Sequence, residues 1–178
     1  IGNPDHAEII ASRSYGRHIS VVYDEDAVDA LADGLGRTVA ICQTTITREK
    51  FERLVRCIRE RKYPELRAVD TRCKPVKNQQ EAVETLAQWV DAMIIVGGYN
   101  SSNTTNLARI AREHLPERTY HIDSDALVQS EWLDGGRHLG IGAGTSTPKE
   151  QIAAVQTRIA DLYPGRVAFR TGDGPLPT

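Results

Sequence analysis

The hydrophobic pattern of the chain alternates between short apolar runs and longer amphipathic stretches. Apolar runs predict strands at 19–23, 38–42, 66–69, 93–98, 119–122 and 139–142, with 167–170 as a candidate last strand. Helical spacing of apolar positions predicts helices at 25–33, 48–61, 79–90, 104–114, 126–133 and 148–162. Strands that alternate with helices are typical of the α/β class with parallel sheets.

The pattern repeats in two halves of similar size. We therefore predict two similar α/β domains with parallel sheets and flanking helices, at residues 1–69 and 70–163, followed by a C-terminal tail at 164–178. No linker composition marks the boundary, which we place at 67–70. The chain opens on Ile1-Gly2 without Met, and we expect these residues to be the end of a strand whose body lies upstream.

Charge and hydropathy exclude some classes of partner. The chain has 22 basic and 24 acidic residues, so neither sign argues for a nucleic-acid or membrane partner. No apolar run approaches the roughly 18 residues of a spanning helix, and from this sequence we expect no signal peptide. A cytoplasmic protein, or one of the plastid stroma, is expected.

Four loops that follow predicted strands and precede predicted helices are rich in small polar residues. They are Gln43-Thr44-Thr45, Asp70-Thr71-Arg72-Cys73, Asn100-Ser101-Ser102-Asn103 and Ala143-Gly144-Thr145-Ser146. In a parallel sheet such loops share the carboxyl edge, where ligands bind. Helix N-termini and hydroxyl or amide side chains together predict a phosphate site that needs no Lys or Arg.

Ordinary helix capping is the alternative explanation for each of these loops. Thr147-Pro148-Lys149-Glu150 has the pattern of a capping box with Pro at the first helical position. The 100–103 loop is harder to explain by capping, because one cap needs one such residue and four stand in a row. Gly97 and Gly98 would let the backbone there approach a ligand closely.

The three cysteines are far apart and form no CxxC pair, so neither a zinc site nor a disulfide framework is indicated. Cys73 stands in a loop just ahead of a helix, where a thiol is either inert or a ready metal ligand or nucleophile. Cys42 ends a buried strand and Cys57 borders the apolar face of a helix, so both are interpreted as core packing.

His6 and Glu8 lie two residues apart near the start of the chain. On an extended segment that spacing places both on one side, and a His beside a carboxylate can move protons. Exposed His-x-Glu pairs are also common by chance.

The series of motifs resembles that of the LytB family of hydroxymethylbutenyl diphosphate reductases. The residues that carry the resemblance are Ile1-Gly2 with His6-x-Glu8, then Gln43-Thr44-Thr45, Asp70-Thr71-x-Cys73, Gln80-Glu81-Ala82, the segment VGGYNSSNT at 96–104, and Gly140-Ile141-x-Ala143-Gly144-x-Ser146-Thr147-Pro148. The resemblance covers nearly the whole chain, and VGGYNSSNT is its most specific part. It implies two of the three lobes of the family's trilobal α/β fold.

The resemblance also implies a function and roles for individual residues. Cys73 is similar to the third of three cysteine ligands of a [4Fe–4S] cluster. The substrate diphosphate would be held by His6, Ser101, Ser102, Asn103 and Ser146; Glu8 would donate a proton, with Thr44 in the relay. The implied enzyme is an oxidoreductase that removes the allylic hydroxyl of hydroxymethylbutenyl diphosphate, giving isopentenyl and dimethylallyl diphosphates. Its electrons would come from a donor such as ferredoxin or flavodoxin.

The sequence departs from the family pattern in several places. The family's N-terminal third is absent, and with it the other two cluster cysteines, so the isolated chain is expected to be inactive. The family usually has an apolar residue at the position of Arg72, a threonine at the positions of Val76 and Gly142, and an arginine at the position of Gln79.

Three hypotheses follow. The chain is part of a reductase whose N-terminal part is a separate polypeptide or has been cut away. Alternatively, it is a non-catalytic LytB-like protein that binds a diphosphate or a partner protein. Thirdly, it is an unrelated nucleotide- or sugar-phosphate-binding module, although no GxGxxG or P-loop is present.

Overall fold

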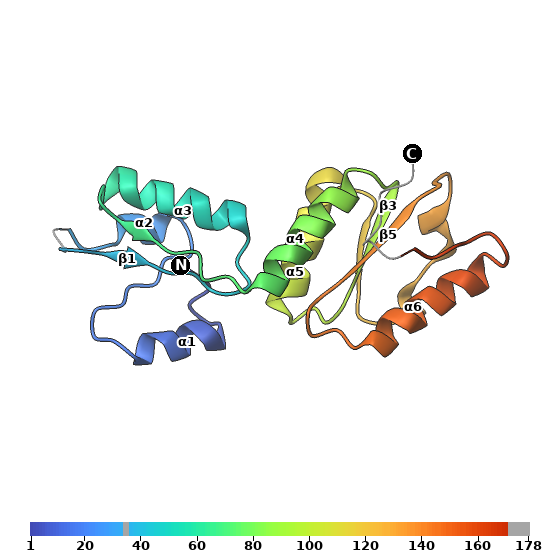
Figure 1. Cartoon of the computed structure of the whole chain (residues 1–178), viewed down its shortest axis with the longest axis horizontal. Helices are drawn as coiled ribbons and strands as arrows, with labels where there is room; N and C mark the ends of the chain where they lie inside the picture. The colour runs from blue at the N-terminus through green and yellow to red at the C-terminus, as the bar shows by residue number, and fades with distance from the viewer. Residues whose placement is uncertain (34–35, 171–178) are drawn as a thin grey trace. The chain divides into compact units, whose positions relative to one another are not determined.

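The computed structural model describes residues 1–33 and 36–170. The chain divides into two compact units, Ile1–Lys74 and Pro75–Thr178, and each is described by itself (Figure 1). This division follows the loop 70–73, a few residues beyond the boundary placed at 67–70. The predicted tail lies partly outside the described residues, which end at 170.

Unit 1 is built around one long amphipathic helix. Its elements are α1 (Ala7–Ser14), α2 (Glu25–Asp29), β1 (Val39–Ala40), α3 (Arg48–Arg61) and β2 (Arg67–Ala68). The two strands pair in parallel, with Val39 opposite Arg67. The apolar face of α3 buries Phe51, Leu54, Val55, Cys57 and Ile58 in the core of this unit.

The first two residues are hydrogen-bonded to two segments of unit 1. The Ile1 nitrogen donates to the Ile41 carbonyl (2.7 Å), and the Ile1 carbonyl accepts from the Gln43 N–H (2.8 Å). On the other side, the Gly2 N–H donates to the Val22 carbonyl (2.9 Å). Ile1-Gly2 therefore joins the loop after β1 to the segment around Val22.

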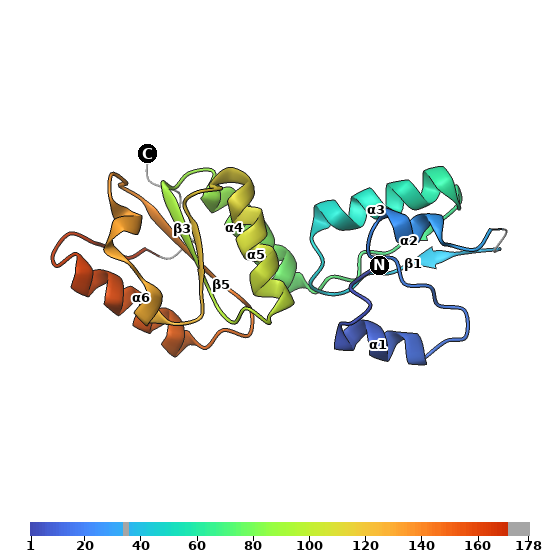
Figure 2. The same cartoon turned by 180° about the vertical axis from the view of Figure 1, so that it is seen from behind.

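Unit 2 is a three-layer α/β structure. Its elements are α4 (Lys74–Ala87, which begins at the last residue of unit 1), β3 (Ala92–Val96), α5 (Ser102–His114), β4 (Thr119–Ile122), the 3₁₀ helices η1 (Asp125–Leu127) and η2 (Ser130–Leu133), β5 (Leu139–Ala143) and α6 (Lys149–Leu162). The strands are parallel in the order β4–β3–β5. Helices α4 and α5 cover one face and α6 the other (Figures 1 and 2). The predicted α/β class with parallel sheets is confirmed.

Several predicted elements are wrong in detail. No strand forms at 19–23, where Ile19 and Tyr23 are exposed and only Val22 is buried. The candidate strand at 167–170 is irregular, the helix at 126–133 is two 3₁₀ turns, and α2 ends four residues early. Helix α1 was not predicted, because among its eight residues only Ile9 is buried and the apolar signal is weak.

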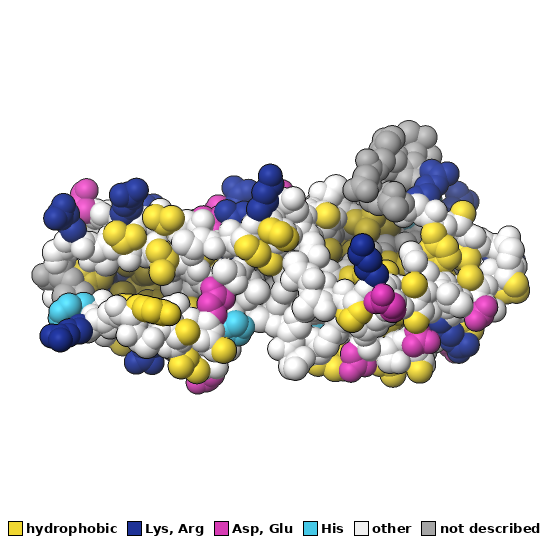
Figure 3. Space-filling view, turned by 60° about the horizontal axis from the view of Figure 1, so that its bottom comes forward, with side chains coloured by type: hydrophobic (Ala, Val, Ile, Leu, Met, Phe, Trp, Pro, Cys, Tyr) yellow, Lys and Arg dark blue, Asp and Glu magenta, His cyan; other side chains and the backbone are white. Residues whose placement is uncertain are grey.

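The surface carries mixed charge. On the face shown in Figure 3, basic and acidic side chains are interspersed and no large area has a single sign. Among the described residues, no helix is long and apolar enough to cross a membrane.

Candidate functional site

Glu8 and Thr44 form the closest polar pair among the candidate residues of unit 1. The Thr44 hydroxyl donates to Glu8 Oε2 (2.8 Å), and the Thr44 N–H donates to Glu8 Oε1 (2.9 Å) and Oε2 (3.2 Å). Both residues are half-buried. The loop after β1 thus fixes the Glu8 carboxylate and places a hydroxyl directly on it, which is the arrangement that a two-residue proton relay needs.

His6 stands at the start of α1, where its ring caps the helix. Its Nδ1 accepts from the Glu8 N–H at 3.3 Å, which leaves Nε2 as the ring nitrogen that carries the proton in the neutral form. The expectation of an extended segment is therefore wrong, because Glu8 lies in the first turn of a helix. The cap joins the His6 ring to the backbone N–H of Glu8, while the Glu8 carboxylate is bound by Thr44.

Gln43 supports this group, a role that sequence reasoning did not assign to it. Its side chain is 3% exposed, Oε1 accepts from the Asn3 N–H (3.0 Å), and Nε2 donates to Thr45 Oγ1 (2.8 Å). Gly2 packs against it so closely that a Cβ would lie 2.8 Å from Gln43 Cβ. The amide thus joins the segment before His6 to the loop that carries Thr44.

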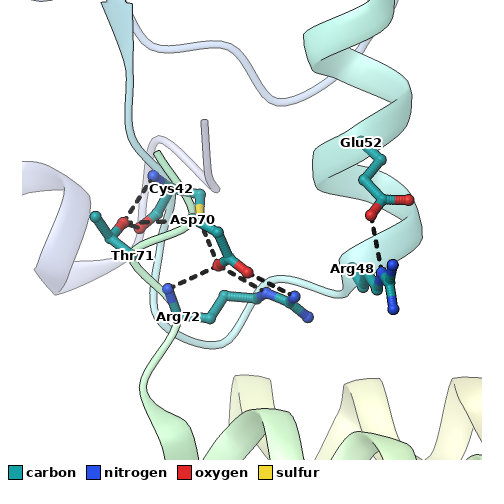
Figure 4. A network of polar contacts seen from close by, with 6 residues as sticks. All are labelled: Cys42, Arg48, Glu52, Asp70, Thr71 and Arg72. Carbon is teal, nitrogen blue, oxygen red and sulfur yellow. Dashed lines mark hydrogen bonds and ion pairs between the residues drawn. The ribbon is translucent and has the colours of Figure 1, made fainter. Parts of the chain in front are cut away.

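The loop 70–73, which carries Cys73, is tied down by its own side chains (Figure 4). Thr71 Oγ1 donates to the Cys42 carbonyl (2.5 Å) and accepts from the Cys42 N–H (2.9 Å). The Arg72 guanidinium binds the Asp70 carboxylate through two contacts, Nε to Oδ1 at 3.0 Å and Nη2 to Oδ2 at 2.8 Å. Cys73 follows this anchored stretch and is exposed.

The described residues do not form a metal centre by themselves. Cys42 and Cys57 are 6% and 7% exposed in the core of unit 1, as predicted. Within residues 1–33 and 36–170, no group of three or more His, Cys, Asp or Glu is placed to hold a metal ion. Iron–sulfur clusters are held by several thiolates, so these residues alone do not fit a [4Fe–4S] cluster, although Cys73 is accessible to serve as one ligand.

The two polar loops of unit 2 lie at the same edge of the sheet. Strands β3 and β5 are parallel neighbours, with Val96 opposite Ala143, so the chain leaves both at their carboxyl ends. The Val96 carbonyl accepts from the Gly144 N–H (3.2 Å) and from Thr147 Oγ1 (3.0 Å). Thr147 is therefore not the cap of α6, as the capping-box pattern predicted, but a tie between the loops; the cap position is Pro148.

The candidate anion-binding residues of unit 2 lie at the start of α5 and in the loop that follows β5. Ser101 is the N-cap and its hydroxyl accepts from the Thr104 N–H (3.3 Å). Ser102 begins the helix and is half-buried, whereas Asn103 is 4% exposed. Ser146 is exposed in the loop after β5. Ser101 thus acts as a cap, and this role accounts for one of the four polar residues of the loop.

Two buried oxygens in this region have no hydrogen-bond partner. They are Asn103 Oδ1 and Thr104 Oγ1, while the Asn103 Nδ2 donates to Gln79 Oε1 at 3.0 Å. Thr104 Oγ1 lies very close to Gly97 and Gly144. A Cβ atom added at either glycine would be 2.9 or 2.2 Å from it, respectively. Buried polar atoms normally have a partner, so two unpaired oxygens at the start of one helix call for an explanation.

A profile of the LytB protein family matches residues 1–160. The chain belongs to the LytB family. Among curated relatives, the 4-hydroxy-3-methylbut-2-enyl diphosphate reductase of Trichlorobacter lovleyi is 38% identical over 162 residues, covering 89% of this chain and 56% of the relative. That of Aquifex aeolicus is 37% identical over 172 residues, covering 94% and 58%. The chain thus spans somewhat more than half the length of these LytB reductases.

Solved LytB structures agree with the fold. A structure of (E)-4-hydroxy-3-methyl-but-2-enyl diphosphate reductase, described as the terminal enzyme of the non-mevalonate pathway, shares 36% identity at a TM-score of 0.52, over 90% of this chain and 57% of that one. The Plasmodium falciparum reductase matches at a TM-score of 0.78 and 19% identity, over 89% and 51%, which supports the fold alone. Family membership excludes the third hypothesis, an unrelated phosphate-binding module.

Proposed function

We propose that this chain is part of a LytB reductase acting in isoprenoid precursor biosynthesis. In the reaction, the C–O bond of the allylic hydroxyl of hydroxymethylbutenyl diphosphate breaks. The hydroxyl leaves as water, and two electrons and two protons give isopentenyl or dimethylallyl diphosphate. An electron donor such as ferredoxin or flavodoxin would supply the electrons.

The proposal rests chiefly on the edge of the sheet in unit 2. Two loops of different parts of the sequence leave neighbouring parallel strands there, and the Thr147–Val96 hydrogen bond ties them together. The N-terminus of α5 brings the positive end of its helix dipole to this edge. Hydroxyls of Ser101, Ser102 and the exposed Ser146 add donors that suit the diphosphate of the substrate, and Asn103 would add its NH₂ group if its amide turned away from Gln79.

Unit 1 would contribute the proton chemistry. Glu8 is the proposed proton donor, and the Thr44 hydroxyl that donates to its Oε2 forms the neighbouring link of the relay. His6, with Nδ1 accepting at the helix start, has Nε2–H as a donor for a phosphate oxygen.

The cluster is the part of the proposal that this chain supports least by itself. Cys73 would be one ligand of a [4Fe–4S] cluster, and the remaining thiolates would come from the part of longer LytB proteins that this chain does not span, on the same or a separate polypeptide. The single accessible cysteine among the described residues equally favours the second candidate function, a non-catalytic LytB-like protein that binds a diphosphate or a partner.

Inorganic diphosphate is the probe that tests the anion site. Titration into the chain, followed by calorimetry, should show binding that Ser101→Ala and Ser146→Ala each weaken about tenfold, the range for loss of one hydrogen bond to a charged group. Ser130→Ala replaces an exposed serine of the same unit far along the chain and should bind as the unaltered chain does. Equal affinity of all four proteins would refute the diphosphate site.

A further inference from the structure

Two carboxamides face each other beside the start of α5. Asn103, in the first turn of that helix, donates from Nδ2 to Gln79 Oε1 of α4 at 3.0 Å. This leaves Asn103 Oδ1 buried and without a partner, although the residue is only 4% exposed. A buried amide that is half satisfied calls for an explanation, since native structures rarely leave such an acceptor unpaired.

The orientation of the pair also conflicts with anion binding. A diphosphate only accepts hydrogen bonds, so an asparagine that binds it must turn its NH₂ group toward it. In the observed orientation that group is directed at Gln79 and the oxygen is turned elsewhere. If both amides rotate by half a turn, Gln79 Nε2 donates to Asn103 Oδ1, and Asn103 Nδ2 takes the place of the unpaired oxygen.

We propose that Gln79 is a positioning residue that sets which way the Asn103 amide points, and that a bound diphosphate selects the orientation in which Gln79 donates. The inference rests on the proposed function, because it assigns the freed NH₂ group to the diphosphate. Glutamine suits this role because it can either donate or accept. An arginine at this position could only donate and would hold the single orientation that presents the NH₂ group.

The experiment replaces Gln79 by residues that can only accept or only donate a hydrogen bond. In Gln79→Glu the carboxylate can only accept, so it keeps the Asn103 NH₂ group directed at itself and away from the diphosphate. Binding of inorganic diphosphate should weaken by about tenfold or more. Gln79→Arg can only donate and should bind at least as tightly as the unaltered chain. Asn78→Glu and Asn78→Arg place the same charges one residue away on the exposed surface of α4 and correct for charge alone.

Two further readouts separate positioning from folding. Gln79→Met removes both the donor and the acceptor without adding charge, and this variant should bind diphosphate several-fold more weakly. All variants should keep their unfolding midpoints. The side-chain amide ¹⁵N resonance of Asn103, assigned by its loss in Asn103→Ala, should shift on diphosphate addition in the unaltered chain and stay in place in Gln79→Glu.

The outcomes distinguish the two levels of the proposal. If the unaltered chain binds diphosphate but Gln79→Glu and Asn78→Glu weaken it equally, or Gln79→Met binds undiminished, the role of Gln79 is refuted while the diphosphate site stands. If the unaltered chain does not bind diphosphate, the proposed function fails and the inference fails with it.

Discussion

The Glu8 carboxylate is held by three contacts from a single residue. The Thr44 N–H and hydroxyl both donate to it, and the two residues are 36 positions apart in the chain. Such a pair fixes both the position of the carboxylate and the path by which a proton could reach it. A substitution that keeps the shape of the side chain can therefore separate proton donation by Glu8 from the contacts that Glu8 makes with Thr44.

Glu8→Gln is the substitution that does so. The Gln oxygen can still accept from Thr44, so the fold of unit 1 and binding of diphosphate should be retained. Turnover of the complete reductase, with the rest of the protein supplied, should fall by about 10²–10⁴ from loss of a general acid. Asp5→Asn, an exposed acid of the same segment, should leave the rate unchanged. Undiminished turnover of Glu8→Gln would remove Glu8 from the mechanism.

At the scale of residues, the sequence was enough to propose candidate site residues but not their hydrogen-bond partners. The motif series pointed to Glu8 and Thr44, but no spacing rule pairs residues 36 apart, because only the topology of unit 1 brings them together. Gln43 was noted only as part of a motif, since its supporting role depends on contacts with residues 40 positions away. The burial of Cys42 and Cys57 was predictable, because it follows from local apolar pattern alone.

At the scale of elements, two glycines, Gly97 and Gly144, allow β3, β5 and α5 to approach closely at the carboxyl edge of the sheet. Gly97 has φ of +141°, a conformation that other residues rarely adopt. Gly144 has no such backbone requirement, yet a Cβ there would lie 2.2 Å from Thr104 Oγ1. The close approach of α5 to the end of β5 therefore depends on the absence of a side chain at 144.

Gly144→Ala tests this packing. Overpacking should lower the free energy of unfolding by about 1–3 kcal/mol. In a Thr104→Ala background the same change should cost clearly less, because the clashing oxygen is gone, and denaturant unfolding of the four proteins measures this coupling. Gly36→Ala, with nothing within 4 Å of the added carbon, is the neutral control. Equal costs in both backgrounds would show that Thr104 does not set the limit.

Elements with a strong periodic signal were predicted better than those with a weak one, although α4 begins at Lys74, ahead of the helix predicted at 79–90. The helix at 48–61 matches α3 at both ends, because five apolar residues recur on one face and Thr47 caps it. The run at 19–23 is as apolar as a strand, but only Val22 finds a core to enter. Thr147 had the pattern of a cap, yet its hydroxyl donates to Val96, 51 residues away, which no local rule anticipates.

At the scale of the whole molecule, the share of the family that the chain spans decides what it can do alone. It matches LytB reductases over 56–58% of their length. Its described residues carry a candidate diphosphate site and a candidate proton relay but one accessible thiol. Binding and redox chemistry are therefore expected to separate experimentally, with the first present in this chain and the second requiring more protein.

We predict that the 178-residue chain alone holds no stable [4Fe–4S] cluster. Several thiolates hold such clusters, and Cys42 and Cys57 would have to leave the core of unit 1 to join Cys73. The purified chain should be colourless, contain less than stoichiometric iron and sulfide, and show no reductase activity.

Addition of the N-terminal part of a longer LytB protein should restore both the colour and the activity, and Cys73→Ser should abolish both. Cys57→Ser serves as the control, since a buried cysteine on the core-facing side of α3 should affect stability and not the iron content of the restored complex. A stable, stoichiometric cluster on the isolated chain that Cys42→Ser or Cys57→Ser removes would contradict the prediction. It would mean that cysteines buried in unit 1 reach an iron centre, which the packing around α3 does not allow without local unfolding.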